Sequence, residues 1–248
     1  MSGFLEIQDL TKDFGGLRAV SGFDLRLDEG ALTCIIGPNG CGKTTLFNLI
    51  TGRYRPTSGR IEFEGRALSG LRPHEIARLG IGRKFQVPAV YPALSVHENL
   101  AVPLFAQAGR RGLRGLLNGG RGTGEIERLL AMVGLAEKID APARSLAHGQ
   151  KQWLEIAALL ASRPRLMLLD EPTAGMTPAE TEATVDLIVR IHGETGTAII
   201  VIEHDMRFVE RLACPTVVML RGELLCQGSY QEVRADPRVR EAYLGKGR

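Results

Sequence analysis

The eight residues from Gly37 to Thr44 read GPNGCGKT, and they constrain the fold of this chain more than any other stretch. They fit the pattern GxxxxGK[ST], a glycine-rich loop whose backbone N–H groups surround phosphate oxygens. The apolar run ALTCII precedes the loop and TTLFNLI follows it, so the loop joins a buried strand to the start of a helix. This context favours a nucleoside triphosphate site over an ordinary glycine-rich turn.

The pattern assigns roles to single residues of the loop. Lys43 would reach the β and γ phosphates, and the hydroxyl of Thr44 would bind Mg²⁺. The residues expected to contact the nucleotide are Gly37, Pro38, Asn39, Gly40, Cys41, Gly42, Lys43, Thr44 and Thr45.

Hydrophobic patterns around the loop predict an α/β fold with two kinds of strand. ALTCII, RLMLLD and TAIIVIE are continuous apolar runs separated by helical patterns, which indicates strands buried in a parallel sheet. FLEIQDL, FDLRLDEG and IEFEG alternate apolar and polar residues, as half-exposed antiparallel strands do. We therefore expect a P-loop NTPase (RecA-like) core with an antiparallel β flank.

The middle of the chain has a different pattern. Between about Val87 and Ala161 the periodicity is helical, which predicts one inserted helical subdomain over 88–161 within a core made of 1–87 and 162–248. A Gly/Arg-rich interruption at 108–124 is either a solvated flexible loop or a contact with anionic lipid or a membrane partner. It carries Arg110, Arg111, Arg114 and Arg121.

Composition excludes several other classes of protein. The formal net charge of +3 over 248 residues is too small to argue for nucleic acid as a partner. Four cysteines without CxxC spacing, and no basic and apolar leader, lead us to expect a reducing cytosol. No apolar run approaches the roughly 20 residues that span a bilayer, which leaves peripheral attachment to a membrane open.

Two acids and a histidine follow apolar runs that should lie beside the loop. Asp170 and Glu171 end RLMLLDE, and neighbours in a strand point opposite ways, so the two carboxylates could have separate roles. Asp170 would hold Mg²⁺ through water and Glu171 would polarise the attacking water, the alternative being a surface acid pair. His204 follows TAIIVIE, where ligands of α/β sheets gather, and would contact the γ phosphate unless it is structural.

The order of these pieces resembles the ATP-binding cassette (ABC) proteins. The matching segments are GPNGCGKTT, Gln86 in RKFQ, LAHGQ at 146–150 where the family has LSGGQ, LMLLDEP, and His204 in VIEHD. The resemblance implies ATP and Mg²⁺ as ligands, with Glu171, His204 and Gln86 as catalytic residues and Thr44, Gln86 and Asp170 around the metal.

The resemblance also implies a dimer. Two cassettes would pack head to tail, so that the signature residues of one close over the ATP held by the other. These residues are Ala147, His148, Gly149 and Gln150. Phe14 would stack on adenine, unless it is an ordinary core residue, and 172–177 would cross the dimer seam.

Three residues depart from the family pattern. Ala147 stands in place of a serine whose hydroxyl would hydrogen-bond the γ phosphate, a bond worth roughly 1.5–3 kcal/mol. His148 replaces a glycine, placing an imidazole near the phosphates or in solvent, and Thr177 replaces a common aspartate. From Ala147 we expect a partner that is a different ATPase, with this signature completing the weaker of two sites.

Within the family, the single cassette without a fused membrane segment, second cassette or long heptad insert is typical of importer subunits. Several segments resemble the branched-chain amino acid and urea uptake group, and HGQKQWLEI, IGRKFQ and AGMT are closer to the urea or short-chain amide branch. The resemblance implies two membrane permeases, a second ATPase and an extracytoplasmic substrate-binding protein as partners. It places the chain peripherally on the cytoplasmic face of the inner membrane.

We therefore predict the ATPase subunit of an importer for a small polar solute such as urea or short-chain amides. Two alternatives stay open: a branched-chain amino acid importer ATPase, and an ABC-type ATP switch without transport.

Overall fold

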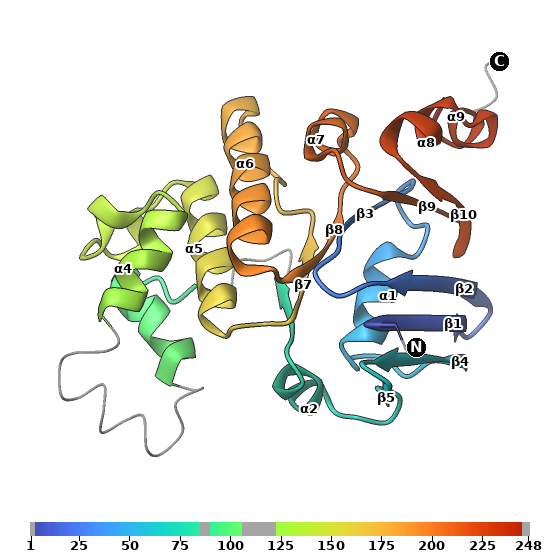
Figure 1. The fold of residues 1–248 in the computed structure, drawn as a ribbon, viewed down its shortest axis with the longest axis horizontal. Helices are drawn as coiled ribbons and strands as arrows, with labels where there is room; N and C mark the ends of the chain where they lie inside the picture. The colour runs from blue at the N-terminus through green and yellow to red at the C-terminus, as the bar shows by residue number, and fades with distance from the viewer. Residues whose placement is uncertain (1–2, 85–89, 106–122, 245–248) are drawn as a thin grey trace.

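The computed structural model describes residues 3–84, 90–105 and 123–244, and these form two sheets with helices packed around them (Figure 1). The larger sheet has six strands in the order β10-β9-β3-β8-β7-β6. β6, β7, β8, β3 and β9 run parallel, and β10 is antiparallel to β9. Its strands are β3 (Leu32–Ile36), β6 (Ile81–Lys84), β7 (Leu166–Asp170), β8 (Ala198–Ile202), β9 (Thr216–Leu220) and β10 (Glu223–Gly228).

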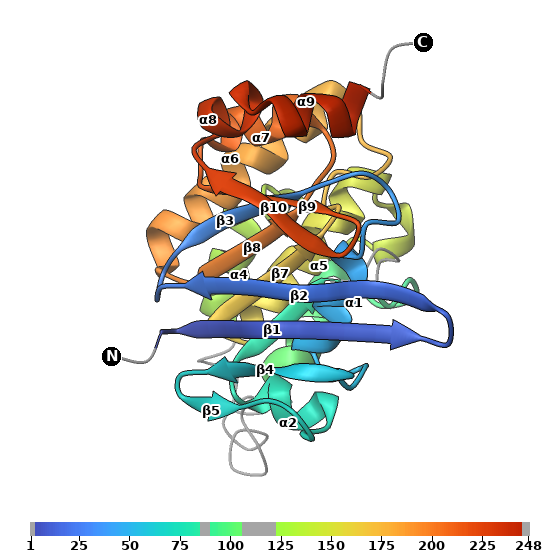
Figure 2. The ribbon, with the colours of Figure 1, turned by 90° about the vertical axis from the view of Figure 1, so that its right-hand side faces the viewer.

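The smaller sheet is antiparallel and has the order β2-β1-β4-β5, which Figure 2 shows face on. It consists of β1 (Leu5–Phe14), β2 (Leu17–Leu27), β4 (Ser58–Phe63) and β5 (Arg66–Ala67). Its alternating burial matches the alternating sequence pattern, whereas every residue of β7 and β8 is buried. The predicted α/β core with an antiparallel flank is confirmed.

Helix α1 (Lys43–Ile50) lies between the two sheets (Figure 1). Its Leu46, Phe47 and Ile50 belong to one hydrophobic core with Phe23 of the small sheet and Leu168 of the large sheet. The helix therefore joins the sheets through apolar burial, and the phosphate loop before it is fixed by both.

The opposite face of the six-stranded sheet carries a second hydrophobic core. It is covered by α5 (His148–Ala161), α6 (Pro178–Thr195), α7 (Met206–Leu212) and α8 (Tyr230–Ala235), with α9 (Pro237–Leu244) after them. A short helix, α2 (Pro73–Arg78), precedes β6.

The described part of the predicted helical subdomain contains α4 (Thr123–Met132), α5 and a helix over residues 96–105. Within these residues no named strand occurs. Ile156 and Leu169 belong to the same core, so α5 packs on the large sheet as well. The boundaries at 87 and 161 stay a prediction, and the four arginines of the 108–124 segment lie outside the described residues.

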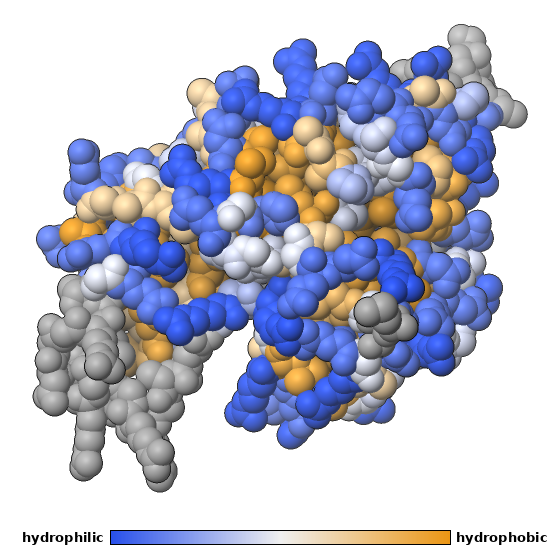
Figure 3. Space-filling view, in the orientation of Figure 1, coloured by the Kyte–Doolittle hydropathy of each residue, from blue (hydrophilic) through white to orange (hydrophobic). Residues whose placement is uncertain are grey.

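Most of the surface shown in Figure 3 is polar, with an apolar area near its middle. Among the helices that the structure describes, none combines the length and apolar character needed to span a bilayer.

Two neighbours on α6 test how much this packing stabilises the fold. Ile188 is completely buried and Val189 is 46% exposed. Ile188→Ala should lower the free energy of unfolding by about 2–5 kcal/mol, because it removes buried methyl groups and leaves a cavity. Val189→Ala should change it by less than about 0.5 kcal/mol. Denaturant titrations of both variants compare the two sites, and equal effects would contradict this account of the core.

Candidate functional site

The phosphate loop has a shape that only glycine permits at two positions. Gly42 precedes α1 with φ of 107°, and an added Cβ there would overlap the carbonyl oxygen of Ala19. An added Cβ at Gly37 would overlap the carbonyl oxygen of Met219 in the same way. The loop therefore runs in close contact with β2 and β9. The first N–H groups of a helix such as α1 have no partner within the helix and can bind phosphate oxygens.

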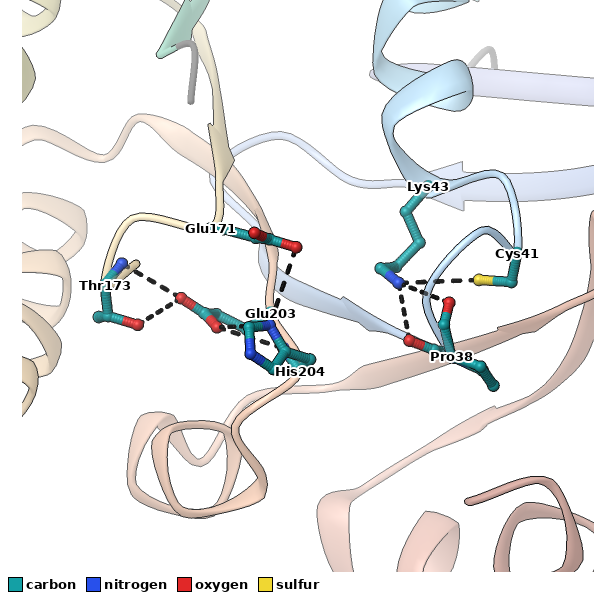
Figure 4. A network of polar contacts seen from close by, with 8 residues as sticks. Pro38, Cys41, Lys43, Glu171, Thr173, Glu203 and His204 are labelled. Atoms are coloured by element: carbon teal, nitrogen blue, oxygen red, sulfur yellow. Dashed lines mark hydrogen bonds and ion pairs between the residues drawn. The ribbon is translucent and has the colours of Figure 1, made fainter. Parts of the chain in front are cut away.

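Lys43 is buried, and its ammonium group lies against the loop itself (Figure 4). Nζ donates hydrogen bonds to the carbonyl oxygens of Gly37 at 2.7 Å and Pro38 at 3.0 Å. Cys41 Sγ is 3.8 Å away, and burial raises the pKa of that thiol while Lys43 opposes the shift. The ammonium is thus held where the loop would enclose phosphate oxygens.

A cavity of about 600 Å³ opens beside this loop, which suits a nucleotide-sized ligand. Phe14 lines it and is 39% exposed, with its ring edge-to-face on Tyr54 at a centroid distance of 5.1 Å. This exposure argues against the core alternative for Phe14. The loop and its helix contribute Asn39, Gly40, Gly42, Lys43, Thr44 and Thr45, and Glu171 lines the cavity as well.

Asp170, at the end of β7, is completely buried. Its Oδ2 accepts a hydrogen bond from Arg83 Nη2 at 2.8 Å. Burial raises the pKa of Asp170, and the neighbouring guanidinium opposes that shift. Oδ1 has no hydrogen-bond partner among the described residues.

These groups fit a magnesium ion. Mg²⁺ prefers oxygen ligands and is held by one or two carboxylates together with water and substrate phosphates. Oδ1 of Asp170, which is buried without a partner among the described residues, and the hydroxyl of the exposed residue Thr44 can supply such oxygen ligands. Gln86, the third residue predicted to contact the metal, lies outside the described residues.

Glu171 follows the last residue of β7. The sequence pattern had predicted Asp170 and Glu171 in one strand, with their side chains on opposite faces. The φ of Glu171 is 47°, so a left-handed turn, and not the pleat of β7, separates its carboxylate from that of Asp170. Glu171 Oε1 is 3.8 Å from Nδ1 of His204, whose side chain is 55% exposed (Figure 4). The exposure shows that His204 is not a buried structural histidine.

Glu203 is a residue of this site that the sequence analysis missed. It is buried, and its Oε1 accepts two hydrogen bonds from Thr173, one from the hydroxyl at 2.6 Å and one from the backbone N–H at 3.2 Å. Oε2 accepts the N–H of His204 at 3.2 Å. Burial raises the pKa of Glu203, and these hydrogen bonds oppose the shift. The sequence could have pointed to Glu203, because it is an acid at the end of an apolar run, as Asp170 is.

The signature residues begin α5, away from the cavity. Ala147 precedes the helix and has no side-chain oxygen, while the Gln150 side chain accepts the Ala147 N–H at 3.1 Å. Nε2 of His148 is 3.0 Å from the carbonyl oxygen of Ala174, a hydrogen bond when Nε2 carries the proton. Thus His148 contacts the predicted seam loop. None of the described residues lining the cavity comes from 147–150.

The seam loop, residues 172–177, ends at the start of α6. Thr177 caps this helix, because its Oγ1 accepts the N–H of Glu180 at 3.3 Å. The Thr177 N–H in turn donates to Glu180 Oε2 at 2.9 Å. Thr177 therefore has a structural role within its own chain, whatever it contacts across a dimer.

Comparisons with known proteins agree with this geometry. The family model described as "ABC transporter" matches residues 20–174, and one described as "Branched-chain amino acid ATP-binding cassette transporter" matches residues 223–248. The chain is 39% identical to the high-affinity branched-chain amino acid transport ATP-binding protein BraF of Pseudomonas aeruginosa, over 98% of both chains. It is 37% identical to the LivG protein of the same description from Escherichia coli K12, again over 98% of both.

Among solved structures, the chain is similar to an ATP-binding cassette of an ABC transporter in its ADP conformation. The TM-score is 0.84 at 29% sequence identity, and the match covers 99% of this chain and 100% of the other. The described fold is therefore that of a nucleotide-binding cassette.

The loop geometry predicts the effect of one added methyl group. Gly42→Ala should weaken binding of ATP by about 10-fold or more, because it combines a strained φ with an overlap on the Ala19 carbonyl. Gly124→Ala is the matched control, since an added Cβ there meets no described atom within 4 Å. Titration with a fluorescent ATP analogue measures both. Normal affinity in Gly42→Ala would contradict the proposed loop packing.

Proposed function

Because the chain belongs to the ATPase subunits of ABC transporters, in the branched-chain amino acid group, we propose that it powers the import of branched-chain amino acids. The observation that carries this proposal is full-length similarity at 39% identity to a branched-chain amino acid transport protein, together with the C-terminal family match at residues 223–248. The urea or short-chain amide reading rests on short segments of the sequence alone.

The site residues support a direct attack of water on the γ phosphate of ATP. Glu171 lies on the cavity wall and would polarise the water, and His204 beside it would contact the γ phosphate. Lys43 would exchange its bonds to the loop carbonyls for bonds to phosphate oxygens. Mg²⁺, held through Thr44 and Asp170, would neutralise charge on the phosphates.

The distance of the signature residues from the cavity of their own chain supports a head-to-tail dimer. Residues 147–150 do not line the cavity of their own chain, so they are available to close the cavity of a second cassette. ABC ATPase subunits work with membrane permeases, and we propose two permeases, a second ATPase and an extracytoplasmic binding protein as partners. The chain would then sit peripherally on the cytoplasmic face of the membrane, attached through the permeases.

Uptake measurements test the cargo. Cells whose only copy carries Glu171→Gln should lose uptake of labelled leucine, because the variant binds ATP but lacks the carboxylate that polarises water. The control is Glu182→Gln, which changes an acid on α6 whose side chain is 63% exposed. Labelled urea is measured in parallel.

The outcomes separate the three proposed functions. Loss of leucine uptake alone supports the branched-chain amino acid importer, and loss of urea uptake alone would move the chain to the urea branch. If neither uptake changed, the branched-chain amino acid proposal would be wrong, and either another cargo or the ABC-type switch without transport would take its place.

The missing hydroxyl of the signature gives a second test. Ala147→Ser should raise ATP turnover of the assembled heterodimer severalfold, because a hydrogen bond to a charged phosphate contributes about 1.5–3 kcal/mol. Ala136→Ser, which adds an exposed hydroxyl elsewhere, is the control. An unchanged rate in Ala147→Ser would count against a weakened site.

A further inference from the structure

Among the described residues, β6 is an edge strand of the six-stranded sheet. Two of its basic side chains are nevertheless buried. The side chain of Arg83 is 5% exposed and that of Lys84 is 0% exposed. Neighbours in a strand point to opposite faces, so the two cations serve different sides of the sheet. Lys84 Nζ is 3.7 Å from Oε2 of Glu155 on α5, whereas Arg83 contacts α1. Neither residue is among the predicted ligands of ATP or Mg²⁺.

Arg83 joins the phosphate-loop helix to the end of β7. Its Nη1 donates to Asn48 Oδ1 at 2.7 Å, and its Nη2 donates to Asp170 Oδ2 at 2.8 Å. The guanidinium carbon lies 5.4 Å from the centre of the Phe47 ring. A planar guanidinium that bonds two acceptors through two different nitrogens fixes their relative positions more rigidly than an ammonium group, whose N–H donors share one nitrogen and rotate.

The acceptor on α1 stands on the face of the helix that also presents Thr44. Asn48 follows Thr44 by four residues, and residues with this spacing lie one above the other on a helix. Arg83 occupies Oδ2 of Asp170, and Oδ1 has no partner among the described residues. Arg83 therefore connects Asp170, one predicted metal ligand, to α1, the helix that carries the other predicted ligand, Thr44.

We propose that Arg83 is a positioning residue for Mg²⁺: by bridging Asn48 and Asp170 it sets the separation of Asp170 from Thr44 and directs one carboxylate oxygen to the metal shell. The inference rests on the assignment of Thr44 and Asp170 to Mg²⁺. A purely neutralising role for Arg83 leads to a different expectation, since removing a positive charge beside Asp170 would then strengthen cation binding.

Asn48→Ala tests the brace while retaining the Arg83–Asp170 ion pair. The affinity of the purified chain for the methylanthraniloyl derivative of ATP is measured with Mg²⁺ and with EDTA, and the ratio of the two affinities gives the Mg²⁺ enhancement. We expect Asn48→Ala to reduce this enhancement about 10-fold, as removal of groups that orient metal ligands does, with the affinity in EDTA unchanged.

Thr51→Ala, at the residue that follows the last turn of α1, is the matched control. The Thr51 hydroxyl donates to the carbonyl oxygens of Phe47 at 2.7 Å and Asn48 at 3.5 Å, so its loss weakens the end of α1. The side-chain hydrogen bonds of Arg83 to Asn48 and Asp170 remain in this variant. The Mg²⁺ enhancement should stay at its natural value in this variant. If Thr51→Ala and Asn48→Ala lost the Mg²⁺ enhancement equally, a less stable α1 would explain both losses, and the proposal would be overturned.

Arg83→Lys separates position from charge. The variant keeps the positive charge but lacks the two separate nitrogens that bond Asn48 and Asp170, so the enhancement should fall as in Asn48→Ala. Natural or stronger enhancement in Asn48→Ala overturns the proposal, and Asn48→Ala alone decides if Arg83→Lys does not fold. If the natural chain shows no enhancement by Mg²⁺, the metal assignment fails and the brace fails with it, which is a distinct result.

Discussion

The close contact of the phosphate loop with two strands is the constraint on which the site depends. Gly37 approaches the carbonyl of Met219 on β9, and Gly42 approaches the carbonyl of Ala19 on β2. The loop thus contacts both the large and the small sheet, and α1, which follows it, buries apolar side chains against both sheets. Because both sheets fix the loop, its backbone N–H groups are held in place before any phosphate arrives, which lowers the cost of ordering them on binding.

The loop meets the other half of the site because the parallel strands end at one edge of the sheet. β7 delivers Asp170 and Glu171, and β8 delivers Glu203 and His204 to the same edge. Two of these acids, Asp170 and Glu203, are buried and hydrogen-bonded to neighbours. Arg83 is bonded to Asp170, and Thr173 is bonded to Glu203. Buried carboxylates of this kind are costly to leave unpaired, so the pairings fix the geometry of the site as well as its charge.

The sequence predicted the parts of the site whose local pattern is self-contained. The spacing of glycines around Lys43 specifies a phosphate loop, and continuous apolar runs specify β3, β7 and β8, because both faces of those strands are covered. β6 was not predicted, because its four residues include Arg83 and Lys84 and show no apolar run. Its basic residues are buried only because Asp170 and Glu155, distant in sequence, lie opposite them.

The sequence by itself determined the type of fold, the phosphate loop and the order of the motifs, since each follows from residues that are close together along the chain. Only the tertiary structure decided how Glu171 departs from Asp170, that His148 contacts Ala174, and that Arg83 connects α1 to β7. These features depend on a backbone turn and on hydrogen bonds between segments far apart in the sequence. Hydrophobic periodicity reports which face of an element is buried, but it carries no information on which polar group lies across from it.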